Sequence, residues 1–193
     1  MTERLFSLIG AKYRGYASDI TRSWPISGKF TEAQQEIYSL VLKSQEAAIA
    51  ACKVGNPYTA PHDEARRVLA EGLIALGIIS QTLDDALDPM NGELRNWYMH
   101  NTSHWIGLDV HDVGVYKPGG TPRMLESGMC LTVEPGLYFG AWRPDVDCPE
   151  RYANIGIRIE DDVLVTENGP VVLTSACPKT LDDIQSIVGQ PLS

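Results

Sequence analysis

The 193-residue sequence lacks the cysteine pattern of a disulfide-stabilised or zinc-ribbon protein. Its four cysteines are widely separated and form no Cys-x-x-Cys pair, which favours a reducing compartment over secretion. No apolar run approaches the roughly 18 residues that a membrane-spanning helix requires, so we expect no membrane partner. The cysteines are Cys52, Cys130, Cys148 and Cys177.

Basic residues are also in deficit. The 16 Lys and Arg against 25 Asp and Glu give a formal net charge of -9, which disfavours a nucleic-acid partner. There is no low-complexity tract, clear linker or close internal repeat, so residues 1–193 are expected to form one domain. The N-terminal residues match a signal peptide or transit peptide only weakly. We expect an intracellular protein.

Histidine is scarce as well, but three of the four histidines fall within residues 100–114. Histidine is the commonest metal ligand, so this density indicates a site, with ordinary hydrogen-bonded histidines as the alternative. Gly107, Gly114 and the alternation over 108–113 favour extended chain over helix. We therefore expect the three histidines on strand and loop. They are His100, His104 and His111.

Carboxylates occupy unusual places in the predicted strands. Residues 5–27 predict a β-hairpin with Asp19 on its second strand. Glu134 and Glu160 each lie in an otherwise apolar strand, and a buried carboxylate needs a cation or a partner. Arg158 can serve as the partner of one glutamate, but it does not easily explain both. Carboxylates with one histidine suit Mn²⁺, Co²⁺ or Zn²⁺ better than a thiolate zinc site, so the residues alone predict a hydrolytic metal centre.

Helical periodicity predicts two long helices after the hairpin. Thr31 and Gln34 form a capping box at the start of the first helix. The second begins near Thr59, and its first turn contains His62, which is expected to be a surface or capping residue. The other predicted elements are a short helix over 82–87, a strand over 129–139 that carries Glu134 and turns at Pro135-Gly136, strands over 155–166 and 171–173, and a closing helix over 179–188.

Four blocks in order carry a family resemblance. They are YRGYASDITR at 13–22, HNTSHWIGLDVHD at 100–112, LTVEPGLY at 131–138 and GIRIEDD at 156–162. Together they closely resemble the catalytic domain of the Xaa-Pro aminopeptidase family, in the creatinase/methionine aminopeptidase (M24) superfamily. The resemblance implies an α+β pita-bread fold, a curved antiparallel sheet flanked by helices. It also implies removal of the N-terminal residue from peptides with proline at the second position.

The resemblance assigns a ligand set. The family holds two divalent metals, Mn²⁺ foremost with Zn²⁺ or Co²⁺ as alternatives, through two aspartates, one histidine and two glutamates. Of these, Asp19 and Glu160 match the carboxylates that bridge the two metals. The matching metal ligands are Asp19, His104, Glu134 and Glu160.

The resemblance also assigns catalytic roles. Glu134 is expected to accept the proton of the attacking water, whereas His100 and His111 contact the substrate and stabilise developing charge. Arg158, close to Glu160, helps to shape the prolyl pocket. The implied partner is a peptide with proline second, and a homo-oligomer is possible.

One departure from the family weakens the second metal position. The family's first aspartate lies eleven residues before the bridging one, and this sequence has Leu8 there, which cannot bind a metal. One metal position therefore keeps four ligands and the other keeps only two, so we expect one metal and impaired hydrolysis. Family strands upstream of residue 1 are not present, so the fold is expected to be incomplete at its N-terminal side.

Two other functions stay open. A prolidase, which cleaves only dipeptides, is disfavoured by the Ser103-His104-Trp105 context and the short segment over 115–129. A non-catalytic binding module on the same fold is favoured by Leu8. The choice between a mitochondrial and a cytoplasmic location is also left open.

Overall fold

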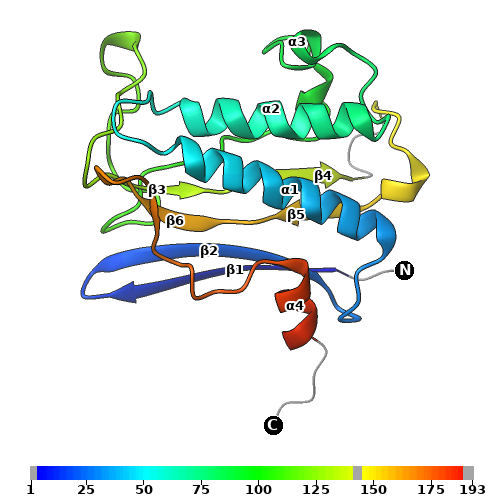
Figure 1. Cartoon of the computed structure of the whole chain (residues 1–193), viewed down its shortest axis with the longest axis horizontal. Helices are drawn as coiled ribbons and strands as arrows, with labels where there is room; N and C mark the ends of the chain where they lie inside the picture. The colour runs from blue at the N-terminus through cyan, green and yellow to red at the C-terminus, as the bar shows by residue number, and fades with distance from the viewer. Residues whose placement is uncertain (1–3, 141–144, 189–193) are drawn as a thin grey trace.

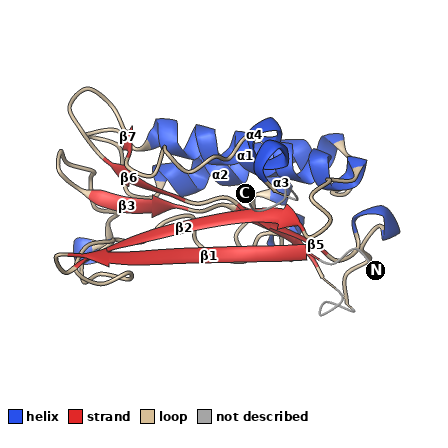
Figure 2. Ribbon diagram, turned by 90° about the horizontal axis from the view of Figure 1, so that it is seen from below, coloured by secondary structure: helices blue, strands red, loops and turns tan. Residues whose placement is uncertain are grey.

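The computed structural model describes the backbone of residues 4–140 and 145–188, and side chains from residue 9. A layer of antiparallel strands lies on one side, and two long helices cover one face of it (Figure 1, Figure 2). This is the predicted α+β architecture. The strands are β1 Arg4–Tyr13, β2 Tyr16–Pro25, β3 Cys130–Val133, β4 Gly136–Phe139, β5 Ile155–Arg158, β6 Asp161–Leu164 and β7 Val171–Val172. The α-helices are α1 Glu32–Ala51, α2 Ala60–Ala75, α3 Leu83–Ala86 and α4 Leu181–Ile187. Single turns of 3₁₀ helix span Glu93–Asn96, Pro118–Gly120 and Glu150–Tyr152.

The predicted hairpin is confirmed as β1 and β2. Arg14 (φ 52°) and Gly15 (φ 91°) form its two-residue turn, since two positive φ values match the twist of the flanking strands. The register places Gly10 opposite Asp19 and Leu8 opposite Thr21. The pair β1 and β2 forms one of three small sheets, beside β3-β6-β7 and β4-β5.

The predicted capping box is confirmed at the start of α1. The Thr31 hydroxyl accepts the N–H of Gln34, and the Gln34 side chain accepts the N–H of Thr31. Helix α2 packs against α1 so closely that a Cβ at Gly72 would lie 2.2 Å from a methyl group of Leu40. The buried faces of both helices form the main core with β4 and β5. No helix among the described residues is long and apolar enough to cross a membrane.

Both long predicted strands are interrupted where the chain passes the site: the predicted turn at Pro135 and Gly136 divides the first, whereas the prediction of an unbroken strand over 155–166 is wrong. The segment over 129–139 divides into β3 and β4 at Glu134 and Pro135, and proline has no N–H for a ladder. The segment over 155–166 divides into β5 and β6 at Glu160, whose N–H donates to Thr21 O at 3.1 Å. Each break leaves a glutamate outside a regular strand.

The extended chain predicted over 108–113 is also wrong. Residues 108–111 form a succession of bends, residues 112 and 113 belong to no strand, and Leu108 and Val113 are exposed. The carboxylate of Asp112 accepts the backbone N–H groups of both Leu108 and Val113. These local hydrogen bonds compete with those of a β-ladder, because the aspartate carboxylate binds backbone N–H groups that a neighbouring strand would otherwise bind.

Candidate metal centre

Three of the predicted metal ligands converge from separate parts of the chain. Asp19 lies on β2, His104 on the loop before β3, and Glu160 between β5 and β6. One ligand atom from each lies within 4.8 Å of the others, and His104 Nε2 is 3.6 Å from Asp19 Oδ2. An isolated β-bridge between Thr21 and Glu160 joins β2 to the junction between β5 and β6. It thereby brings Asp19 close to Glu160.

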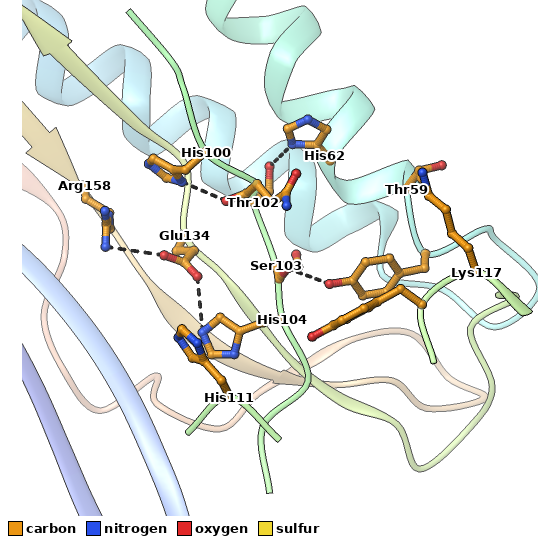
Figure 3. Close-up of a pocket in the computed structure, with 13 residues that line it drawn as sticks. Thr59, His62, His100, Thr102, Ser103, His104, His111, Lys117, Glu134 and Arg158 are labelled. Carbon is orange, nitrogen blue, oxygen red and sulfur yellow. Dashed lines mark hydrogen bonds and ion pairs between the residues drawn. The ribbon is translucent and has the colours of Figure 1, made fainter. Parts of the chain in front are cut away.

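The fourth predicted ligand, Glu134, lies beside this group at the end of β3. Its Oε1 is 3.3 Å from His104 Nε2, and its Oε2 is 3.5 Å from a guanidinium nitrogen of Arg158 (Figure 3). Thr132 donates its hydroxyl to Oε1 at 3.2 Å. Arg158 is therefore a partner of Glu134, but its charge compensates only part of the cluster.

Burial makes the metal-free carboxylates weak acids. It raises the pKa of Glu134 to about 7, against the opposing charge of Arg158. Burial also raises the pKa of Glu160 to about 8, and the nearby Glu134 adds to the effect. Burial raises the pKa of Asp19 too, although His104 opposes it. Such a cluster stays ionised at neutral pH only when a cation compensates the negative charge.

The buried donor set fits a divalent cation. Oε1 of Glu160 is buried and has no hydrogen-bond partner among the described residues, whereas its Oε2 accepts the hydroxyl of Thr21. Nδ1 of His104 is 3.1 Å from Trp105 O, so the tautomer that donates this bond leaves Nε2 as a ligand. One imidazole with carboxylate oxygens is the set that Mn²⁺, Co²⁺ or Zn²⁺ accepts.

A cavity of about 770 Å³ extends from His104 and Glu134, and the predicted substrate-binding residues line it. The ring of His111 lies 4.2 Å from that of His104. Nε2 of His100 is 2.8 Å from the hydroxyl of Tyr138, which also accepts the Nε–H of Arg158 at 2.8 Å. Burial lowers the pKa of His100 to about 4, so this imidazole is neutral at pH 7.

The prediction that His62 is a surface or capping residue is wrong. Its ring lines the cavity, and its Nδ1 is 2.8 Å from the hydroxyl of the fully buried Thr102. Burial lowers the pKa of His62 to about 4. Tyr138 also reaches the site without having been predicted. One sequence feature could have indicated that His62 faces inward: it lies three residues before Ala65, a buried residue of the same helix.

Leu8 has a defined place in the backbone. It lies on β1 opposite Thr21, the residue whose hydroxyl bonds Glu160. Residue 8 therefore lies on the strand next to β2, which carries Asp19. A leucine side chain has no atom that can bind a metal. The loss of one metal position stays a prediction.

Comparison with known proteins places the chain in a family. Residues 5–167 match metallopeptidase family M24. The chain is 45% identical over 179 residues to Xaa-Pro aminopeptidase of Escherichia coli (strain K12), covering 93% of this chain and 39% of that protein. It is 38% identical to intermediate cleaving peptidase 55, mitochondrial, of Arabidopsis thaliana, covering 93% of this chain and 34% of that protein. The chain thus spans about two fifths or less of these relatives.

Solved structures agree with the sequence match. The structure of Pseudomonas aeruginosa aminopeptidase PepP superposes with a TM-score of 0.87 at 42% identity, covering 94% of this chain and 40% of that chain. Zn-substituted Escherichia coli aminopeptidase P in complex with product gives a TM-score of 0.84 at 45% identity, covering 94% and 40%. The chain therefore belongs to metallopeptidase family M24 and has part of the pita-bread fold of aminopeptidase P.

Proposed function

We propose that residues 1–193 form an M24-type catalytic domain that removes the N-terminal residue from peptides with proline at the second position. The observation that carries the proposal is the convergence of Asp19, His104 and Glu160, with Glu134 beside them, where His104 and Glu134 also line a large cavity. The relatives named Xaa-Pro aminopeptidase support the substrate class. We propose an intracellular location, either cytoplasmic or mitochondrial, and a homo-oligomer stays possible.

The four ligands would hold one divalent cation. A bound cation of this kind supplies Lewis acidity and lowers the pKa of water. Glu134 accepts a proton from the attacking water at Oε1, which faces His104, while Arg158 holds Oε2. A carboxylate with one oxygen held by a guanidinium and the other facing the reacting water is placed for this role.

The cavity walls orient the peptide. His111 lies against His104 and can face the reacting carbonyl group. His100, Tyr138 and Arg158 form a chain of hydrogen bonds along the wall, which fixes the two rings and the guanidinium in place. The amide nitrogen of proline carries no N–H. A general peptidase that binds the N–H at this position therefore fits proline poorly, whereas a site that does not depend on this N–H can accept it.

The experiment is a metal titration followed by a hydrolysis assay. We expect this chain to bind one Mn²⁺ or Zn²⁺, and the variant Leu8→Asp to bind two, as calorimetry would measure. Tripeptides with proline second should be hydrolysed, with Gly-Pro as the test for prolidase and a proline-free tripeptide as the control. Loss of one metal's electrostatic contribution costs roughly 10²–10³ in rate, by analogy with the deletion of an oxyanion-hole donor, and Leu8→Asp should recover part of it.

Leu8 also supports a second function, a binding module without catalysis. In that case the chain would bind metal and proline peptides, and neither this chain nor Leu8→Asp would hydrolyse them. Absence of metal binding with all four ligands intact would contradict the catalytic proposal.

A further inference from the structure

A second cavity, of about 450 Å³, adjoins the one that contains the metal ligands. The two cavities share His62, His100 and Asn101 as lining residues. Figure 3 shows His62 and His100 on one side of the first cavity and His104 and His111 on the other. The second cavity therefore continues from the side of the site that lies beyond His100.

Arginines dominate the remaining wall of this second cavity. Arg66 lies one turn after His62 on α2, and Arg95 lies in the 3₁₀ turn that precedes Tyr98. Among the described residues, no aspartate or glutamate lines this cavity. A cationic hollow of this kind is unexpected in a chain whose net charge is -9.

Both guanidinium groups keep donors to offer. Arg66 donates one N–H to Leu87 O at 2.6 Å, and Arg95 donates one to Met90 O. Neither has a carboxylate within 4.0 Å among the residues that the structure describes. The nearby Asp88 accepts the N–H groups of Met90 and Asn91, and its charge also attracts Arg95 without forming an ion pair with it, so it offsets only part of the positive charge. Since a guanidinium carries five N–H donors, most of them are available to a ligand.

Charge decides which part of a peptide this cavity receives, and here the reasoning rests on the proposed aminopeptidase function. Only one residue precedes the bond that an aminopeptidase cleaves, and that residue carries the α-ammonium group. Arg66 and Arg95 repel an ammonium group, so the N-terminal residue is excluded from this cavity. The chain that follows proline is the part that remains.

We propose that the second cavity binds a carboxylate of the substrate downstream of proline, and that Arg66 and Arg95 determine this specificity. The carboxylate is either the C-terminus of a short peptide or an acidic side chain. Both present the planar pair of oxygens that a guanidinium binds through two parallel hydrogen bonds. The ligand class is therefore an anionic peptide segment.

The test measures binding of leaving fragments, which needs no turnover. Pro-Ala-Ala carries a C-terminal carboxylate, Pro-Ala-Glu-amide a side-chain carboxylate, and Pro-Ala-Ala-amide neither. We expect the carboxylate that reaches the cavity to tighten binding to the Mn²⁺-loaded chain by about 10- to 100-fold over the amide, as calorimetry would measure. Comparison of the first two peptides identifies the source of the carboxylate.

Variants assign the preference to the cavity. Arg66→Gln and Arg95→Gln should each weaken it, and the double variant should abolish it with metal binding unchanged. Arg67→Gln is the matched control, because Arg67 is the next residue of α2 and pairs with Glu64 and Glu71 instead. Equal affinities in the parent chain, or a preference that survives in the double variant, would overturn the proposal.

A second probe keeps the cavity testable if the proposed function itself fails and no proline peptide binds. Glutarate is titrated into the chain while the imidazole signals of His62 and His100 are followed by NMR. Saturable shifts that disappear in the Arg66→Gln, Arg95→Gln double variant support an anion site. No shift in the parent chain overturns it. Failure of the proposed function is seen separately, in the metal titration and the hydrolysis assay.

Discussion

The metal-free protein should lose stability as the pH rises, which is the reverse of ordinary acid denaturation. Glu160 is fully buried with one unpaired oxygen, and its pKa rises from 4.5 to about 8 on folding. The folded protein therefore holds a proton that the unfolded chain releases above pH 4.5. Stability from this group is complete below pH 4.5 and is lost as the pH rises through about 8.

The magnitude follows from the displacement of the pKa. At about 1.4 kcal/mol for each tenfold change in proton affinity, a pKa that moves from 4.5 to about 8 corresponds to about 5 kcal/mol. Glu134, whose pKa rises to about 7, acts in the same direction. A typical domain has about 5–15 kcal/mol of unfolding free energy, so this loss is a large fraction of the total. Bound cation should reverse the trend, because it replaces the protons.

Urea denaturation, followed by the fluorescence of the four tryptophans, measures the effect at pH 5, 7 and 9. One series contains a chelator and the other contains Mn²⁺. The variant Glu160→Gln is the control, because it keeps the shape of the side chain and removes its titration. It should reduce the slope of the profile in chelator and leave the contribution of Glu134. The lowered pKa values of His62 and His100 oppose the glutamates only below about pH 6.5. If the unfolding free energy of the metal-free parent were equal at pH 7 and 9, the buried carboxylate cluster would be refuted.

Three further perturbations test separate parts of the structure. His104→Gln should weaken Mn²⁺ binding by more than the roughly 10- to 100-fold typical of outer partners of a metal site, and unchanged affinity would remove His104 from the ligand set. Asp161→Ala should cost about 3–5 kcal/mol in urea denaturation, because it strands the buried Arg22 that it contacts at 2.8 Å; a loss below about 1 kcal/mol would contradict this reading. Thr31→Ala should cost about 1 kcal/mol through the lost helix cap, with Thr31→Ser close to neutral.

Local chemistry in the sequence determined the hairpin, the two long helices and the closing helix. The turn at Arg14 and Gly15 and the capping box at Thr31 act over a few residues, so their signals survive without the rest of the fold. The four sequence blocks likewise singled out Asp19, His104 and Glu160 as candidate ligands through residue type and order, and the fold brings these three together. The absence of a ligand atom at Leu8 is also a property of the sequence alone.

Only the tertiary structure decided where the strands break and which side chains meet. Thr21 and Glu160 are 139 residues apart, and their contact depends on how β2 lies against the junction of β5 and β6. His62 enters the cavity because the packing of α2 directs it toward Thr102, which its own sequence context does not specify. The raised pKa of the glutamates and the cationic second cavity arise in the same way, since burial and the distance between charges exist only after folding.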